Sequence, residues 1–195
     1  MIIFMYKRIC VTNRHLVKGD FFEQIGQVVS SKNPPDIIVL REKDLKTCEY
    51  LEYATKLSNM DLANTSLYIH NHMEVAKSLN IRNIHLSFSK FMEIKDLKSL
   101  RPYFDNIGTS IHSLEDIRLC NEQGFDYVFA GHIFETDCKK GLKGRGLDFL
   151  KEIVANANMP VYAIGGINRS NEEECIKAGA LGVCKMSEYM LQKLI

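Results

Sequence analysis

Residues 131–146, GHIFETDCKKGLKGRG, place one histidine, four basic residues, two acidic residues and four glycines within sixteen positions. His132 follows a run of small and apolar residues, and an imidazole there is suited to moving protons near neutral pH. Position alone leaves a catalytic role and a structural hydrogen bond equally open. Cys138 has no adjacent base in the sequence, so we expect its thiol to be a spectator. The segment is either a catalytic loop around His132 or a solvated crossing between a strand and a helix.

Two glycines in AIGGIN, residues 163–168, lie between an apolar run and the expected start of a helix. Bare backbone N–H groups and a helix dipole at such a point can hold a phosphate. A tight glycine turn is the alternative, because such turns are common. The last apolar run is followed by Met186 and Ser187, and the last two loops of barrel folds often build phosphate sites. Together the segments favour a phosphate site at Gly165, Gly166, Met186 and Ser187.

Two cations, Arg41 and Lys43, stand two residues apart at the end of VLREKD, residues 39–44. This spacing puts both on one face of a strand, where they suit an anionic ligand. Ion pairs with Glu42 and Asp44, or a solvated rim, are the alternative and are favoured for this segment taken alone.

Three histidines, His70, His72 and His85, lie near the ends of two further apolar runs. The first two have the i, i+2 spacing with which one strand face presents two imidazoles to a metal ion. No carboxylate accompanies them in an evident ligand pattern. We therefore expect polar or core histidines and no metal.

The elements that must position these side chains form a repeating pattern of strands and helices. Short apolar runs suit strands that are buried on both faces, and segments with helical spacing separate them. Residues 113–124 and 168–179 each open with Ser or Asn, carry acids in the first turn and end at Gly. The pattern predicts an α/β fold, a (β/α)8 TIM barrel in a single domain over residues 1–195, rather than a doubly wound open sheet. The predicted strands are residues 8–13, 36–42, 66–71, 83–88, 106–112, 126–133, 160–166 and 181–187.

Active sites in barrels of this kind lie where the strands end and the following loops begin. Asn71 and Ser110 join the ligand-binding candidates for this reason. The polar or glycine positions predicted at this rim are Asn13, Arg41, Lys43, Asn71, His72, His85, Ser87, Ser110, His112, His132, Gly165, Gly166 and Ser187.

The chain has 195 residues, and 25 Lys and Arg against 24 Asp and Glu give a formal net charge of +1. This balance provides no general attraction to nucleic acid or to an anionic membrane, so we expect neither as a partner. Six cysteines without a CxxC pair, no secretory signal and no membrane-length apolar stretch predict a soluble, cytoplasmic protein. We expect a homodimer, because two-fold dimers are the commonest assembly.

Four blocks in series, LREKD, GTSIHSLED, DYVFAGHIFETDCKKG and YAIGGI, resemble the thiamine phosphate synthase superfamily across essentially the whole chain. The resemblance implies a barrel that binds a small-molecule thiazole phosphate, with its phosphate on Gly166 and the region of Met186 and Ser187. The synthase branch joins a pyrimidine diphosphate to the thiazole phosphate and uses Mg²⁺ held by two aspartates. Their positions here are assigned to His72 and to Lys90 or Ser89, which cannot replace Mg²⁺-binding carboxylates.

The TenI-type thiazole tautomerase branch resembles the sequence more closely, because His132 stands where synthases tend to have proline. The predicted function is therefore isomerisation of a carboxythiazole phosphate tautomer to its aromatic form in thiamine biosynthesis. His132 acts as general acid and base, and no metal or other cofactor is needed. We expect Arg41 and Lys43 to hold the substrate carboxylate or to stabilise charge during the proton transfer, with Thr136 and Lys139 as further ligand contacts.

Two alternatives stay open. A thiamine phosphate synthase with rearranged metal ligands would require Mg²⁺ for turnover. A non-catalytic regulator that binds thiazole or thiamine phosphates would show binding without turnover, since a fold alone does not prove activity.

Overall fold

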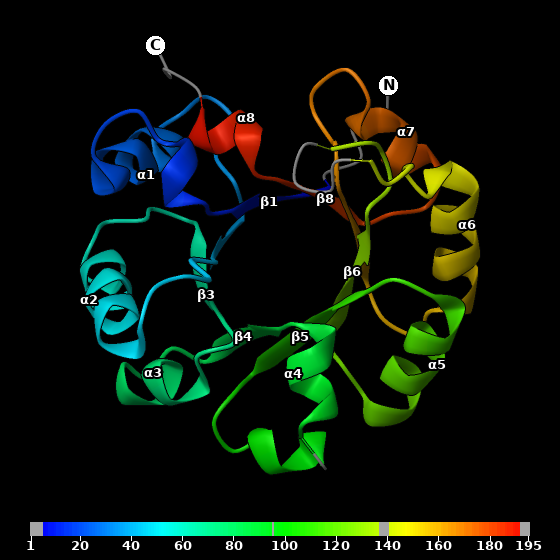
Figure 1. Cartoon of the computed structure of the whole chain (residues 1–195), viewed down its shortest axis with the longest axis horizontal. Coiled ribbons are helices and arrows are strands. Elements are labelled where there is room, and N and C mark those ends of the chain that lie inside the picture. The colour runs from blue at the N-terminus through cyan, green and yellow to red at the C-terminus, as the bar shows by residue number, and fades with distance from the viewer. Residues whose placement is uncertain (1–5, 95, 137–140, 192–195) are drawn as a thin grey trace.

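The computed structural model describes residues 6–94, 96–136 and 141–191, and it shows a closed barrel of eight parallel strands surrounded by helices (Figure 1). Each strand pairs with the next along the chain, and β8 closes the barrel against β1. The predicted (β/α)8 TIM barrel is confirmed. The strands are β1 (Lys7–Val11), β2 (Ile37–Leu40), β3 (Ser66–His70), β4 (Asn83–Leu86), β5 (Asn106–Ile111), β6 (Tyr127–Gly131), β7 (Val161–Ile164) and β8 (Gly182–Lys185).

Helices follow every strand in the described part of the chain, and none of them is long and apolar enough to cross a membrane. Two short 3-10 helices, η1 (Arg14–Leu16) and η2 (Leu97–Leu100), lie in the connections after β1 and β4. The α-helices are α1 (Phe21–Val29), α2 (Thr47–Ser58), α3 (Met73–Ser78), α4 (Phe88–Met92), α5 (Leu114–Gln123), α6 (Gly146–Asn156), α7 (Glu172–Lys177) and α8 (Ser187–Met190).

The hydrophobic core has two layers, because successive side chains of a strand point to opposite faces. The outer layer joins the barrel to the helices. Gly108 marks how closely the inner layer is packed, since a Cβ at that position would overlap the ring of Tyr127. The inner layer inside the barrel consists of Ile9, Val11, Ile37, Val39, Tyr68, Tyr127, Phe129 and Cys184, with Tyr162, Ile164 and Met186 packed against it.

The helix predicted over residues 113–124 forms as its sequence dictates. Ser113 caps α5 by accepting a hydrogen bond from the backbone N–H of Asp116 at 3.1 Å. Gly124 ends it at φ 76°, in the left-handed region that a glycine adopts without a Cβ penalty.

The helix predicted from residue 168 begins later, because α7 starts at Glu172. The side chain of Asn168 instead closes a turn, in which its Oδ1 accepts hydrogen bonds from the N–H and the hydroxyl of Ser170 at 2.8 and 2.6 Å. No helix therefore starts directly after the glycine pair, and the expected helix dipole is not available at Gly165 and Gly166.

Candidate active site at the barrel mouth

The carboxyl ends of the parallel strands meet on one rim, which we call the barrel mouth. Lys139 and Cys138 lie outside the described residues. Whether the residues at the mouth bind a ligand stays a prediction. The predicted residues that the structure brings to the mouth, on or just after the strand ends, are Arg41, Lys43, Asn71, Ser110, His132, Thr136, Gly165, Gly166, Met186 and Ser187.

The loop after β7 is pressed against the loop after β6, and its two glycines allow this contact. Gly165 has φ 106° and Gly166 has φ 65°, both in the left-handed region. A Cβ on Gly165 would lie 2.5 Å from the Cβ of His132, and one on Gly166 would lie 2.8 Å from the Cβ of Phe134. The glycines are thus needed for the close approach of two loops, as well as for any approach of a ligand.

Backbone amides at this end of the mouth are available to a ligand. Within the described ranges, the N–H groups of Gly165, Gly166 and Ser187 donate no hydrogen bond to another residue. Unpaired amides on adjacent loops form a concave donor site for a phosphate. We call this region, formed by Gly165, Gly166 and Ser187, the amide clamp.

A buried ion network lies behind the amide clamp. The side chain of Lys185, only 3% exposed, places its Nζ 2.6 Å from Glu172 Oε2 and 2.9 Å from Glu188 Oε1. Glu188 also accepts a hydrogen bond from the backbone N–H of Arg169 at 3.1 Å. The network ties β8 to the first residues of α7 and α8 and to the loop after β7, so it fixes the spacing of the two loops that carry the clamp. No local sequence pattern predicts this network, because its members are dispersed over residues 169–188.

His132 lies beside the clamp and is 6% exposed. Its Nε2 is 3.4 Å from the carbonyl oxygen of Leu142, and its buried Nδ1 has no hydrogen-bond partner among the described residues. The imidazole therefore lies between the loop after β7 and the segment that leads to α6. Its backbone carbonyl accepts a hydrogen bond from the N–H of Arg145 at 3.0 Å, which holds the same segment.

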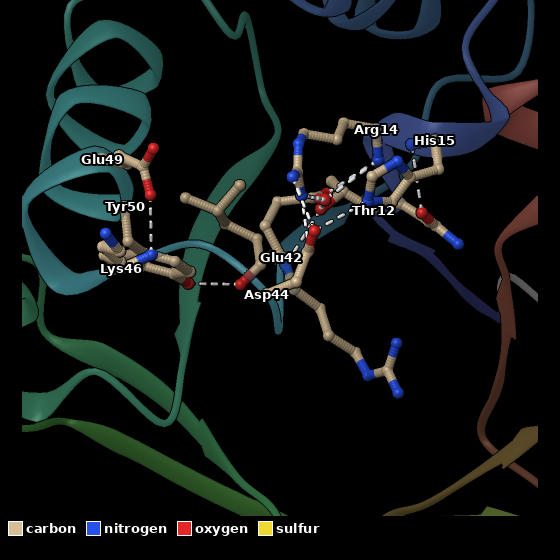
Figure 2. Close-up of polar contacts among 11 residues, drawn as sticks. Thr12, Arg14, His15, Glu42, Asp44, Lys46, Glu49 and Tyr50 are labelled. Atoms are coloured by element: carbon tan, nitrogen blue, oxygen red, sulfur yellow. Dashed lines mark hydrogen bonds and ion pairs between the residues drawn. The ribbon is translucent and has the colours of Figure 1, made fainter.

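The acids after β2 are held by residues of the segment that follows β1 (Figure 2). Glu42 is 2% exposed and accepts hydrogen bonds from the Thr12 hydroxyl at 2.6 Å and the Arg14 N–H at 3.1 and 3.0 Å. Asp44 accepts two bonds from the Arg14 guanidinium, at 2.6 and 2.7 Å, and one from His15 at 2.9 Å. These bonds, those of Arg14 first, hold the pKa of Asp44 well below its ordinary value. Sequence reasoning missed Arg14 as the partner, because 28 residues separate it from Glu42.

The cation Arg41 lies one residue beyond the paired Leu40 and Ile69, and its charge acts on the imidazoles of His70 and His85. Val39 lies in the inner layer, and residues two apart on a strand share a face. His70 pairs with His85 on β4, and their rings stack with centroids 5.9 Å apart. We call Arg41, His70 and His85 the inward row.

Both imidazoles of the inward row are neutral at physiological pH. Burial lowers the pKa of His70 well below its ordinary value, and His85, Arg41 and Lys43 lower it further. Burial, with Arg41, lowers the pKa of His85 to about 3. The Nε2 of His85 is 2.9 Å from the Ser110 hydroxyl, and its Nδ1 is 3.1 Å from the Tyr127 hydroxyl. Ser110 is thereby held at the mouth by a buried hydrogen-bond chain.

The loops after β3 and β4 are joined by their own hydrogen bonds. Asn71 accepts a bond from the Ser87 N–H at 2.7 Å and donates one to the Ser87 hydroxyl at 3.2 Å. His72 stacks on Tyr50 with ring centroids 3.9 Å apart, and the Lys90 ammonium donates to Glu93 at 2.6 Å. We call the Asn71 and Ser87 pair the loop clasp.

These contacts do not fit a magnesium site. Mg²⁺ prefers several hard oxygen ligands in octahedral geometry. An imidazole on an aromatic ring and a paired ammonium occupy the positions that the family resemblance assigns to its ligands. Within residues 6–94, 96–136 and 141–191, no group of three His, Cys, Asp or Glu side chains could hold a metal ion.

Comparisons with known proteins agree with one another. Residues 9–189 match the family model described as thiamine monophosphate synthase. A thiamine-phosphate synthase of Methanococcus maripaludis is 31% identical over 85% of this chain and 79% of its own length. A thiamine-phosphate synthase of Clostridium acetobutylicum is 30% identical over 93% of this chain and 86% of its own length. The solved structure of a thiamine phosphate pyrophosphorylase from Pyrococcus furiosus is 26% identical, with a TM-score of 0.80, over 96% of this chain and 89% of that one.

The prediction of a thiazole tautomerase, an isomerase, is wrong. The relatives named above are synthases, which are transferases, and none of these names is a tautomerase. The prediction rested on His132 in place of a proline. The structure gives that residue a packing role against Gly165, so its type alone does not select between the two reactions.

Proposed function

The chain belongs to the thiamine monophosphate synthase family, and from this premise we propose that it is a transferase that joins a pyrimidine diphosphate to a thiazole phosphate. One observation supports the proposal above the others. The barrel mouth carries an amide clamp after β7 and β8 and a pair of cations, Arg41 and Lys43, after β2. Two substrates that each carry phosphate need two such places on one rim.

The reaction forms one bond and breaks another. A ring nitrogen of the thiazole attacks the carbon that bears the diphosphate, a C–N bond forms, and the diphosphate leaves with the electron pair of the C–O bond. Negative charge therefore grows on the leaving diphosphate. The positive charges of Arg41 and Lys43 stabilise that charge, and the amide clamp holds the thiazole phosphate in line.

The residues do not fit the magnesium ion that the family resemblance implies, so no step is assigned to it. His132 is proposed as a contact for the thiazole phosphate beside Gly165. Asn71, Ser110, Met186 and Thr136 are proposed as further substrate contacts at the mouth, and Lys139 is proposed from the sequence alone.

The test is product formation by the purified full chain. The protein is incubated with the thiazole phosphate and the pyrimidine diphosphate, and thiamine phosphate and free diphosphate are quantified by mass spectrometry. We expect the two products in equal amounts, and neither when one substrate is left out. Substrate binding without formation of thiamine phosphate would contradict the proposal and would support the non-catalytic regulator.

A further inference from the structure

The β2–β4 side of the mouth combines buried imidazoles with two cations. This combination determines which groups can bind a diphosphate there. Arg41 directly follows Leu40, which pairs with Ile69, the residue before His70. His70 stacks on His85 across β3 and β4. The pKa of His70 is lowered first by burial and then by the charges around it, among which are both Arg41 and Lys43. Both cations are thus close to the His70 imidazole.

The nearby carboxylates are committed elsewhere. Glu42 lies on the opposite face of the chain from Arg41 and is bound by Thr12 and Arg14. Asp44 is bound by Arg14 and His15. Neither acid is oriented to share a metal ion with the loops after β3 and β4.

The loop clasp also argues against a metal ion between the loops after β3 and β4. A magnesium ion between the loops after β3 and β4 would draw ligands from both of them. Here Asn71 and Ser87 join these loops directly, and both the oxygen and the nitrogen of the Asn71 side-chain amide are used. A divalent cation next to Arg41 and Lys43 would also be repelled, whereas a polyanion is attracted.

From these contacts we infer that this side of the mouth binds the diphosphate through the protein cations Arg41 and Lys43, without a divalent metal ion. The inference rests on the proposed function for its substrate and specifies how the protein binds it. Arg41 supplies a planar set of donors that matches phosphate oxygens in pairs, and Lys43 supplies a second charge. The imidazoles of His70 and His85 stay uncharged, so they do not add to the repulsion between Arg41 and Lys43, and both ring nitrogens of His85 are already bound by Ser110 and Tyr127.

The experiment is calorimetric titration of the full chain with inorganic diphosphate, once in excess chelator and once in magnesium. The protein is expected to bind in chelator with an affinity no weaker than in magnesium. Arg41→Gln is expected to lose at least tenfold in affinity, and Arg41→Lys less, because the ammonium keeps the charge but not the paired donors. Lys46→Gln, which changes an exposed cation five residues away, serves as the matched control and should bind as the parent does.

Binding that appears only with magnesium would overturn the inference, as would Arg41→Gln binding as tightly as the parent. Thermal unfolding of each variant, compared with that of Arg41→Lys, separates loss of a contact from loss of the fold. The same measurements, combined with the product assay, distinguish failure of the inference from failure of the proposed transferase function. Diphosphate binding in chelator with no thiamine phosphate formed would contradict the transferase and leave the inference intact, whereas magnesium-dependent binding with product formed would do the reverse.

Discussion

At the β7–β8 side of the barrel mouth the groups that can meet a ligand are backbone amides, whereas at the β2–β4 side they are side chains. The amides of Gly165, Gly166 and Ser187 are set by backbone conformation and by the ion network of Lys185 behind them. The chemistry of the inward row depends instead on which side chain stands at each of its three positions. A backbone site depends on main-chain conformation, whereas the chemistry of a side-chain site changes with a single substitution. The two sides should therefore respond differently to point mutations.

The largest effect is expected from Lys185→Met, which tests whether the β7–β8 side depends on its buried network. The substitution leaves Glu172 and Glu188 largely buried without their shared cation, and breaking a buried pair costs about 3–5 kcal/mol of unfolding free energy. Urea unfolding measures this loss. Lys151→Met removes an exposed i, i+3 partner of Asp148 and should cost less than about 1 kcal/mol. Equal losses in the two variants would show that the network does not stabilise the clamp.

Gly166→Ala should disable the amide clamp while leaving the inward row intact. Alanine is strained at φ 65°, and its Cβ would overlap the carbonyl oxygen of Glu135, so the loop must move. We expect the affinity for thiazole phosphate to fall about a hundredfold, close to 3 kcal/mol, with diphosphate affinity unchanged. Gly26→Ala, in open space on α1, is the control and should leave both affinities unchanged. Parallel loss of both ligands would remove the distinction between the two sides.

Acid should destabilise the β2–β4 side through its buried imidazoles. His85, which faces Arg41, His70, Ser110 and Tyr127, has its pKa lowered to about 3 in the fold, against an ordinary value of about 6.5. The unfolded chain therefore takes up a proton that the folded chain does not, so stability is full above about pH 6.5 and falls as pH drops toward 3. Between about pH 7 and pH 5 the loss from His85 is about 2 kcal/mol.

Urea unfolding at the two pH values measures this loss, with His85→Gln as the comparison. The glutamine variant should lose less stability over the same range. A pH dependence identical to that of the parent would mean that His85 is not held neutral.

The smallest effect is expected from Ser87→Ala, which opens one bond of the loop clasp. The hydroxyl of Ser87 accepts hydrogen bonds from the Asn71 side chain and from the Lys90 N–H, and losing such bonds costs about 1 kcal/mol. Diphosphate affinity should fall about fivefold, equivalent to that energy, with thiazole phosphate affinity unchanged. Ser58→Ala, whose hydroxyl meets only an exposed carbonyl in α2, provides the matched control in both titrations. No change in diphosphate affinity would show that the clasp does not position Asn71 for the diphosphate.

The strands could be predicted from the sequence because each is a short apolar run buried on both faces. The predicted strands end one or two residues too late at the mouth, as in β2, where polar residues such as Arg41 leave the ladder. The start of α7 could not be predicted, since the side chain of Asn168 closes a turn instead of capping a helix.

Parts of the candidate site could likewise be predicted from the sequence, and other parts could not. The glycine pair was found from a local pattern that backbone conformation alone explains. The partners of Glu42 and Lys185 were not found, because ion pairs between distant segments leave no local pattern. The type of residue at position 132 misled the choice of reaction, since one imidazole serves packing, binding or proton transfer equally well.

A crystal structure of the full chain with thiazole phosphate and inorganic diphosphate, grown in chelator, tests the two-sided mouth most directly. The account predicts the thiazole phosphate on the amides of Gly165, Gly166 and Ser187, and the diphosphate on Arg41 and Lys43 beside the inward row. Both ligands on the same side of the mouth, or no diphosphate beside Arg41, would contradict it.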